Sequence, residues 1–495
     1  MLATTVRADV RQPAVAGAFY PGEKHELEQQ VTEFLRGGPA GAAQPLAVIV
    51  PHAGYVFSGA TAGKVFAALK DVTAKRVILL GPSHHAAFRG AALPSKRTTA
   101  FATPLGEMPI DTAAVESLRR ADGFGGPPEA HGPEHSLEVQ LPFLQMTVGN
   151  VPIVPILVGN VTDLDAAADL ARAIAPLLGE GTIVVVSSDF THHGSPYGHT
   201  PFARDSALGA KLLDLGRATA ERAAAIDARG FMQQVDVSED TVCGARPIVV
   251  ALELLQHAFT GSGKLVAITT SGEVSGNWTQ VVTYAGVSFA GAWDPWRDTE
   301  QPPEIGTLTE TEQKAALALA RATLDTYLNH GPALARWFAE HPVTGNLAAP
   351  AGVFVTLHNT GEKAKRLGRL RGCIGTMEAR ERLVDAIVHN AISVAHDPRF
   401  PELSAGELPA ADLEISVLSP MRSVAGPDAI KLGVHGVTIA KGNHRAVFLP
   451  QVATETGWDI DTFLSQLSLK AGLPADAWRS GMQFQVFTAQ VFGEH

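Results

Sequence analysis

Residues 182–194 read TIVVVSSDFTHHG, and this stretch carries the strongest indication of the fold and of a functional site. It begins with a short run of β-branched residues, a pattern typical of a strand buried on both faces of a sheet. The run ends in polar residues that can do chemistry, among them Asp189 and His192. Because ligands bind at the carboxyl ends of strands in open parallel sheets, we expect these side chains to lie at a functional edge.

The same pattern occurs twice earlier in the chain. Residues 46–54, LAVIVPHAG, carry an apolar run that leads to His52, and residues 76–85, RVILLGPSHH, carry another that leads to His84. A helix expected over 60–70 joins the two strands into a βαβ unit, which places both histidine-bearing loops at one edge of the sheet. One such histidine alone would be interpreted as a loop or core residue. Three strands with this ending predict a metal or acid–base site, because imidazole is the commonest metal ligand.

The composition describes a globular chain with more than one core. The length of 495 residues suggests roughly two to four domains, and 45% of the residues are hydrophobic. The net charge of −11 argues against nucleic acid as a partner. No apolar stretch has the length of a membrane span, and the N-terminal sequence lacks the apolar core of a secretory signal. The two cysteines lie far apart and exclude a disulfide scaffold, so we expect a cytoplasmic protein without membrane association.

The hydrophobic pattern divides the chain into two predicted domains. Residues 1–290 alternate between strand-like and helix-like segments, which is typical of an α/β domain with a sheet flanked by helices. Residues 291–306, GAWDPWRDTEQPPEIG, are polar, contain prolines and lack a hydrophobic period, so we interpret them as a linker. Residues 307–495 begin with a long helical pattern followed by short strands and further helices, which predicts a smaller α+β domain.

Two further features of the first half are candidates for chemistry. Cys243 precedes an apolar segment that we expect to be helical, and the partial positive charge of a helix N-terminus favours a thiolate. Cys243 is therefore a candidate ligand or reactive thiol, and the alternative is a small packed residue. Asp189 and His192 are three residues apart, so the carboxylate can orient the imidazole, or it can cap a following turn.

The most distinctive stretch of the second predicted domain is RLRGCIG, residues 369–375. Its glycines allow close approach of the backbone, and Arg371 with Arg369 can hold an anion. Cys373 is then a candidate nucleophile or pocket residue. The alternative is that the basic residues before it form a solvated surface.

Taken together, the motifs of the first half resemble the Memo family over residues 7–290. The second half resembles an AMMECR-type domain over residues 305–495. The fusion is similar to AmmeMemoRadiSam system proteins, whose name reflects association with a radical SAM partner protein. The motifs that carry the first resemblance are RQPAVAGAFYP (11–21), PHAGYVFSG (51–59), LGPSHH (80–85), EHSLEVQLPFL (134–144), VVSSDFTHHG (185–194) and TVCGARPI (241–248). Those that carry the second are LRGCIG (370–375), DPRFPELS (397–404), LEISVLSP (413–420), RAVFLPQVA (445–453) and GWD (457–459).

The Memo resemblance implies a fold like that of the class III extradiol dioxygenases, non-haem Fe(II) enzymes that open catechol rings with O₂. It places the site on two sets of residues: metal ligands His52, His84 and Cys243, and catalytic candidates Asp189, His192 and His135. This chain departs from the dioxygenases at one position, because they use two histidines and a carboxylate, whereas the third position here is a thiol. A thiolate shifts the metal preference toward copper(I) or zinc without excluding Fe(II).

Three functional interpretations follow. The first is a metal-dependent enzyme, a non-haem Fe(II) dioxygenase-like oxidoreductase that acts on a small aromatic or related molecule. In it His192 moves protons and Asp189 orients His192; the cofactor is a divalent metal, Fe(II) first, with copper and zinc as alternatives. The second is a non-catalytic copper- or iron-binding redox or adaptor protein whose cleft binds a peptide or partner. The third is a metal-dependent hydrolase in which a zinc-bound water is the nucleophile.

Overall fold

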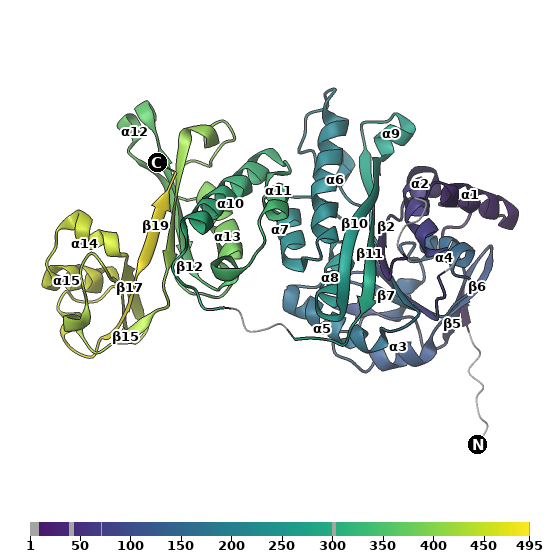
Figure 1. Cartoon of the computed structure of the whole chain (residues 1–495), viewed down its shortest axis with the longest axis horizontal. Helices are drawn as coiled ribbons and strands as arrows, with labels where there is room; N and C mark the ends of the chain where they lie inside the picture. Colours follow the sequence, from purple (N-terminus) through teal and green to yellow (C-terminus); the bar gives the residue numbers. More distant parts are fainter. Residues whose placement is uncertain (1–8, 39–43, 71, 299–302, 495) are drawn as a thin grey trace, which may run out of the picture. The chain divides into compact units, whose positions relative to one another are not determined.

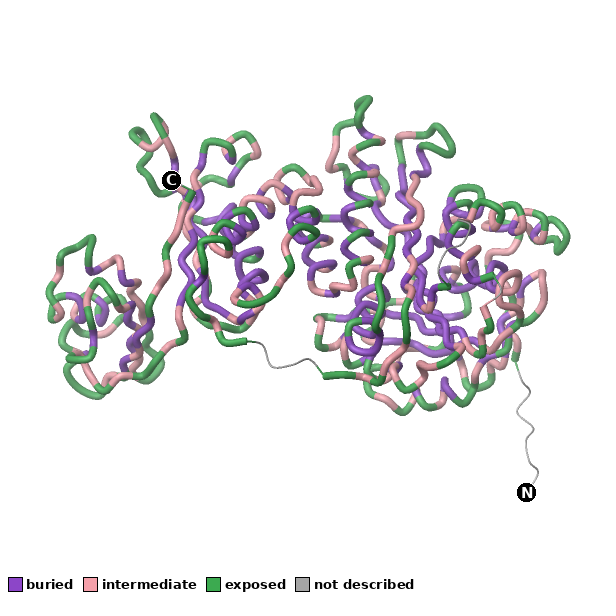
Figure 2. The backbone as a smooth tube through the Cα atoms, viewed as in Figure 1, coloured by how far each residue is buried: buried purple, intermediate pink, exposed green. Residues whose placement is uncertain are grey.

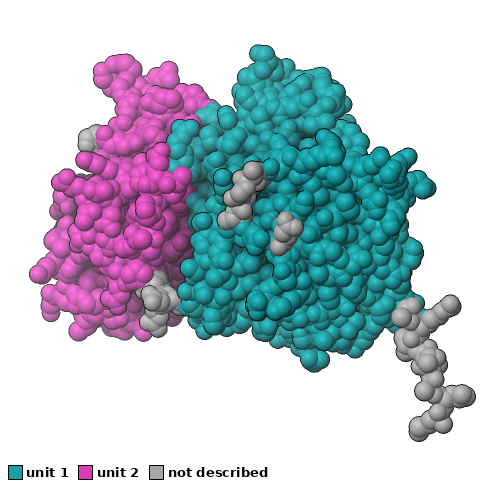
Figure 3. All heavy atoms as spheres, turned by 45° about the vertical axis from the view of Figure 1, so that its right-hand side comes forward, with its two compact units in different colours: residues 1–299, 329–336 teal, residues 300–328, 337–495 magenta. Residues whose placement is uncertain are grey.

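The computed structural model describes residues 9–38, 44–70, 72–298 and 303–494. The chain forms two compact units, one of Met1–Thr299 with Asn329–Arg336 and one of Glu300–Leu328 with Trp337–His495 (Figure 3). The predicted fold class is confirmed: a mixed sheet flanked by helices comes first, and a sheet-rich α+β region follows. Residues 299–302 of the predicted linker lie outside the described part, and the domain limits inferred from the sequence remain a prediction.

An eight-stranded mixed sheet forms the centre of the first unit (Figure 1). Its order is β10-β11-β2-β8-β3-β7-β4, and β9 pairs with β11 outside that path. Strands β2, β8, β3 and β7 run parallel, whereas β11 pairs antiparallel with both β10 and β2, and β4 pairs antiparallel with β7. The strands are β2 (Ala47–Val50), β3 (Arg76–Pro82), β4 (Ala91–Ala92), β7 (Ile153–Val158), β8 (Thr182–Ser187), β9 (His192–His193), β10 (Phe259–Thr270) and β11 (Val281–Trp293).

The strand from the opening stretch, β8, lies between β2 and β3. All six of its residues are buried, as the run of β-branched residues predicts for a strand covered on both faces. Figure 2 shows buried residues gathered in the interior of this unit. Every residue of β2 is buried as well. The carboxyl ends of three neighbouring parallel strands therefore meet at one edge of the sheet.

Two groups of helices cover this sheet. Helices α6 and α8 contact the sheet, α7 contacts both α6 and α8, and α5 contacts α8. Helix α2 contacts β2 and β11 together with α1 and α4. Strands β1, β5 and β6 form a separate small sheet, and α3 follows β6 in the sequence. These elements are α1 (Lys24–Arg36), α2 (Tyr55–Phe66), α3 (Thr112–Leu118), α4 (Leu141–Thr147), α5 (Leu164–Ile174), α6 (Leu208–Ala224), α7 (Ala228–Ser238), α8 (Ala245–Ala258), α9 (Ser271–Ser275), β1 (Asp9–Arg11), β5 (Thr98–Thr103) and β6 (Gly106–Pro109).

The second half of the chain contains two four-stranded antiparallel sheets, in orders β13-β12-β14-β19 and β15-β18-β16-β17. The helix α13 covers β12 and β13. The strands are β12 (Gly352–Asn359), β13 (Leu370–Thr376), β14 (Ala411–Leu418), β15 (Arg422–Val424), β16 (Gly436–Lys441), β17 (His444–Phe448), β18 (Gln483–Phe487) and β19 (Ala489–Gly493). The helices are α10 (Glu310–Asn329), α11 (Ala333–Glu340), α12 (Gly361–Leu367), α13 (Leu383–Ala395), α14 (Pro450–Thr456) and α15 (Ile460–Lys470).

Two elements differ from the sequence-based prediction. The crossover helix starts at Tyr55, five positions before the predicted start at residue 60, so the PHAGY turn leads directly into α2. Strand β11 continues to Trp293, inside the predicted linker, because Phe259 at the start of β10 pairs with that residue. None of the helices in the described ranges is both long and apolar enough to cross a membrane.

Candidate metal centre

The three strand ends deliver their side chains to one place. His52 lies two residues past β2, Asp189 two residues past β8, and His84 two residues past β3. Because β2 and β3 both pair in parallel with β8, these residues leave the same edge of the sheet. The main-chain N–H of His52 donates to Asp189 Oδ1 at 2.8 Å, which ties the first strand end to the central one.

Three histidines form a group that can hold a metal ion. His52, His84 and His135 each offer one ligand atom, and these atoms all lie within 4.8 Å of one another. The His52 ring is 5.1 Å from the His84 ring and 5.5 Å from the His135 ring, measured between centroids. His52 is buried, His135 is partly buried, and the side chain of His84 keeps 30% of its area exposed. The group is therefore closed on one side and open to solvent at His84.

The hydrogen bonds of Ser187 fix the tautomer of His52. Ser187 Oγ donates its one proton to the carbonyl oxygen of Ser136 at 2.6 Å and accepts from Gln140 Nε2 at 3.0 Å. His52 Nδ1, which lies 3.0 Å from the same oxygen, must then be the donor. Its Nε2 keeps the lone pair that a metal needs. Burial, with repulsion from His84 next in size, lowers the pKa of His52 to about 3, so the ring is neutral at physiological pH.

Glu134 supports the other two histidines. Its Oε1 accepts from His84 Nδ1 at 2.9 Å and lies 3.4 Å from His135 Nδ1, and its Oε2 accepts from the main-chain N–H of His84 at 2.6 Å. Burial acts to raise the pKa of the Glu134 carboxyl, but the hydrogen bonds from His84 outweigh it and hold the pKa well below its usual range. Burial lowers the pKa of His135 to about 4. Glu134 was not among the site residues predicted from the sequence, although it directly precedes His135.

Cys243 lies beside this group but outside the three-histidine cluster. Its Sγ is 3.1 Å from His52 Nε2 and accepts from the main-chain N–H of Asp189 at 3.3 Å. The predicted position before a helix is correct, since α8 starts at Ala245. The partial positive charge of the helix N-terminus is not the dominant influence on this thiol. Burial and the negative charge of Asp189 raise the pKa of the Cys243 thiol well above its ordinary value.

The groups that hydrogen-bond to the His192 ring are main-chain carbonyls and not the Asp189 carboxylate. Its Nδ1 lies 2.8 Å from the carbonyl oxygen of Phe190 and 2.9 Å from that of Thr241, so Nδ1–H is the donor and Nε2 is free. Thr241 Oγ1 also accepts from the main-chain N–H of His192 and donates to its carbonyl oxygen. These carbonyl groups orient the ring, and Asp189 instead bonds to His52. Burial raises the pKa of the Asp189 carboxyl, and the charge of His192 opposes that effect.

Aromatic side chains stand next to two of the histidines. Tyr197, 41% exposed, has its ring 5.1 Å from that of His192, and Phe19 has its ring 4.8 Å from that of His135. Neither residue was among the site residues predicted from the sequence. Their signal was weak, because Tyr197 ends a three-residue 3-10 helix between two glycines and Phe19 lies in an irregular N-terminal segment.

The candidates of the second domain, Cys373 and Arg371, lie on β13 and belong to local networks. The main-chain N–H of Cys373 donates to Asp397 Oδ2 at 2.9 Å, and Thr356 Oγ1 lies 3.2 Å from Cys373 Sγ. The Arg371 side chain is 6% exposed and forms an ion pair with Glu407 at 3.4 Å. Lys363 pairs with the same carboxylate, so two cations share one negative charge, and the anion site at Arg371 stays a prediction.

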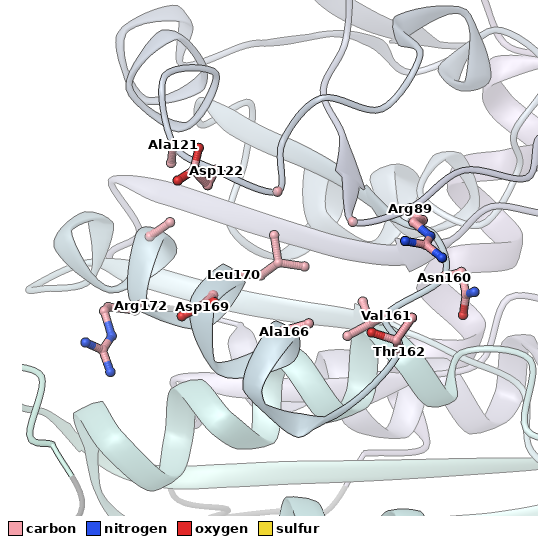
Figure 4. A pocket seen from close by; sticks show the side chains of 13 residues that line it. Arg89, Ala121, Asp122, Asn160, Val161, Thr162, Ala166, Asp169, Leu170 and Arg172 are labelled. Carbon is pink, nitrogen blue, oxygen red and sulfur yellow. The ribbon is translucent and has the colours of Figure 1, made fainter.

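A separate cavity of about 490 Å³ lies between α5 and the loops before it (Figure 4). Arg89 and Asn160 lie on one side of the view, and Asp122 and Asp169 lie on the other. Leu170 is among its apolar lining residues. None of the candidate site residues lines this cavity, so it is distinct from the histidine cluster.

Fold and site together define the first unit as an α/β protein with a candidate metal centre at the carboxyl ends of its parallel strands. The Memo-like protein family matches residues 11–288, and the AMMECR1 family matches residues 317–492. MEMO1 family proteins of Thermococcus onnurineus and Thermococcus kodakarensis are each 34% identical to this chain, over 291 and 292 residues. Both alignments cover 57% of this chain and 99% of the relative.

A crystal structure of an uncharacterized protein from Pyrococcus horikoshii is also similar, with 32% identity and a TM-score of 0.33. That match covers 38% of this chain and 94% of the other. The chain belongs to the Memo-like family, and its second half carries an AMMECR1 domain. Both resemblances inferred from the sequence motifs are confirmed.

Proposed function

We propose that the first unit is a metal-dependent enzyme, a non-haem iron oxygenase that acts on a small aromatic or related molecule. The observation that carries the proposal is the cluster of His52, His84 and His135, whose ligand atoms lie within 4.8 Å of one another. Membership of the Memo-like family, whose fold is related to that of the extradiol dioxygenases, supports the same reading.

The charges around the cluster fit a divalent cation. Glu134 and Asp189 are both buried, and their ion-pair partners among the described residues are histidines, with no lysine or arginine. Because burial lowers the pKa values of His52 and His135, these two rings do not supply a full positive charge to the carboxylates at neutral pH. Buried charges in proteins are paired or coordinate metals, so this arrangement favours a bound cation.

His52 and His84 are common to both candidate ligand sets. The third ligand is His135, which completes the cluster, or Cys243, whose Sγ lies beside His52 Nε2. A metal bound there supplies Lewis-acid and redox chemistry. Nδ1 of both His52 and His84 faces an oxygen, which leaves Nε2 of each as the ligand atom.

The chain's own residues move the proton. His192 Nε2 carries the free lone pair, so it can take a proton from a substrate hydroxyl while Nδ1–H stays on the carbonyl groups of Phe190 and Thr241. The charge of His192 acts against burial and lowers the pKa of the Asp189 carboxyl, so the two side chains lie close enough to interact. Tyr197 packs against the same ring and offers an exposed aromatic face beside it.

The test is anaerobic purification with metal analysis, followed by oxygen-uptake assays on phenolic and indolic compounds. The proposal expects iron near one equivalent and substrate-dependent oxygen uptake that is lost in His84→Ala. Metal binding without uptake on any compound, together with peptide binding at the same cleft, would favour the redox or adaptor alternative. The Cys243 thiol next to His52 supports that alternative, since thiolates prefer copper(I).

A further inference from the structure

We propose that Glu134 is a positioning residue that aims His84 and His135 at the metal and supplies the negative charge that favours a divalent cation. This inference rests on the proposed metal site and adds a residue to it. Glu134 is 2% exposed and directly precedes His135 in the turn before α4.

The hydrogen bonds to Glu134 fix both the orientation and the tautomer of the His84 ring. Both the main-chain N–H and the ring Nδ1 of His84 donate to this carboxylate, at 2.6 and 2.9 Å. Two bonds to one side chain fix the backbone and the ring together. Since a carboxylate only accepts, Nδ1 must carry the proton, and the lone pair of Nε2 points away from Glu134.

The same carboxylate reaches the second histidine. Glu134 Oε1 lies 3.4 Å from His135 Nδ1, and it also accepts from the main-chain N–H of Ser136 at 2.9 Å. The rings of His84 and His135 lie 4.7 Å apart at an angle of 27° between their planes. A single buried carboxylate oxygen thus bonds to His84 Nδ1 and lies within 3.4 Å of His135 Nδ1, beside two imidazoles that are close to parallel.

This geometry matches the known use of carboxylates behind metal-bound histidines. A hydrogen bond to the non-ligating nitrogen fixes the tautomer and raises the basicity of the ligand, and its loss typically costs about 10–100-fold in metal affinity. Glu134→Gln cannot reproduce the arrangement. The carboxylate accepts N–H groups at both oxygens, so the amide –NH₂ must face one of these donors.

The test measures cobalt(II) binding to the full-length metal-free protein by visible absorption. We expect Glu134→Gln to bind cobalt(II) about 10–100-fold more weakly than the wild type. Glu129→Gln is the matched control, because Glu129 is exposed in the same segment. Glu134→Asp retains the charge but is one methylene shorter, so its affinity should be intermediate, and it replaces Glu134→Gln if that variant fails to fold.

A second readout separates positioning from a general effect on folding. Two-bond ¹⁵N NMR of histidine-labelled metal-free protein at pH 8.5 reports which nitrogen of His84 carries the proton, with His84→Ala used for assignment. The proposal expects the Nδ1–H form in the wild type and in Glu129→Gln, and loss of that single form in Glu134→Gln. Equal cobalt(II) affinity of wild type and Glu134→Gln, or an unchanged tautomer, would overturn it. If the wild type binds no cobalt(II), the proposed metal site fails and this inference fails with it.

Discussion

His131, four positions before His135, makes the folded protein sensitive to acid. The residue is 4% exposed, and its Nε2 lies 3.1 Å from the carbonyl oxygen of Ala92, so Nε2–H is the donor. Its own carbonyl oxygen accepts from Arg11 Nε at 2.7 Å. Burial lowers the pKa of His131 to about 4, because the charged imidazolium is poorly solvated there.

The sign of the effect follows from this shift. Between pH 6.5 and 4 the unfolded chain binds a proton at this residue and the folded chain does not, so acid favours the unfolded state. The stability that the neutral ring provides is complete above the ordinary pKa of about 6.5 and is lost as the pH falls toward the folded pKa. Going from pH 7.5 to 4.5, this one group should cost about 2.5 kcal/mol, or about 70-fold in the opening equilibrium.

Hydrogen exchange of the amides of β8, followed by mass spectrometry, measures the opening of this unit in the full chain. His131→Gln keeps a side-chain N–H for Ala92 but cannot titrate, so its loss of stability on acidification should be smaller than that of wild type by this amount. His25→Gln, at an exposed histidine of α1, is the control and should behave like the wild type. The reasoning is refuted if wild type and His131→Gln lose the same stability between pH 7.5 and 4.5.

Three further predictions concern the domain boundary and the site. Limited digestion by a Glu-specific protease should cut first at the exposed Glu304, within the predicted linker 291–306; dominant cuts within 320–480 would count against that boundary. His192→Ala should abolish turnover and leave the metal content near wild type, because Nδ1 is bound to carbonyl groups and Nε2 acts on substrate; loss of the metal would make His192 a ligand. Iodoacetamide should modify Cys243 more slowly in metal-loaded than in chelated protein, with Cys373 as the internal control, because a coordinated thiolate is masked. Equal rates at a filled site would return Cys243 to a packed residue.

The sequence predicted those parts of the fold that depend on local patterns. The β-branched run of β8 and the apolar runs of β2 and β3 identify buried strands, and their shared ending places His52, His84 and Asp189 at one edge. The parallel pairing of neighbouring strands then brings these residues together, as the structure shows. This part of the candidate site was predictable because it follows from strand topology alone.

Contacts between distant segments could not be predicted in the same way. Nothing local indicates that Thr241 holds His192, because the two meet only when the segment before α8 lies against the loop after β8. Glu134 was read as part of a motif, and its role depends on the His84 loop 50 positions earlier in the chain. The pKa of the Cys243 thiol likewise depends on distant contacts. Burial of the thiol and the charge of Asp189 raise this pKa by more than the helix N-terminus beside it lowers it.

An anomalous scattering map collected at the iron edge, from crystals of anaerobically purified protein, tests the central claim most directly. The account predicts a single strong peak bonded to Nε2 of both His52 and His84, with His135 or Cys243 as the third protein ligand. Maps at the copper and zinc edges from the same crystals would distinguish the alternative metals. A peak elsewhere, or no peak at this site at any of the three edges after metal loading, would contradict it.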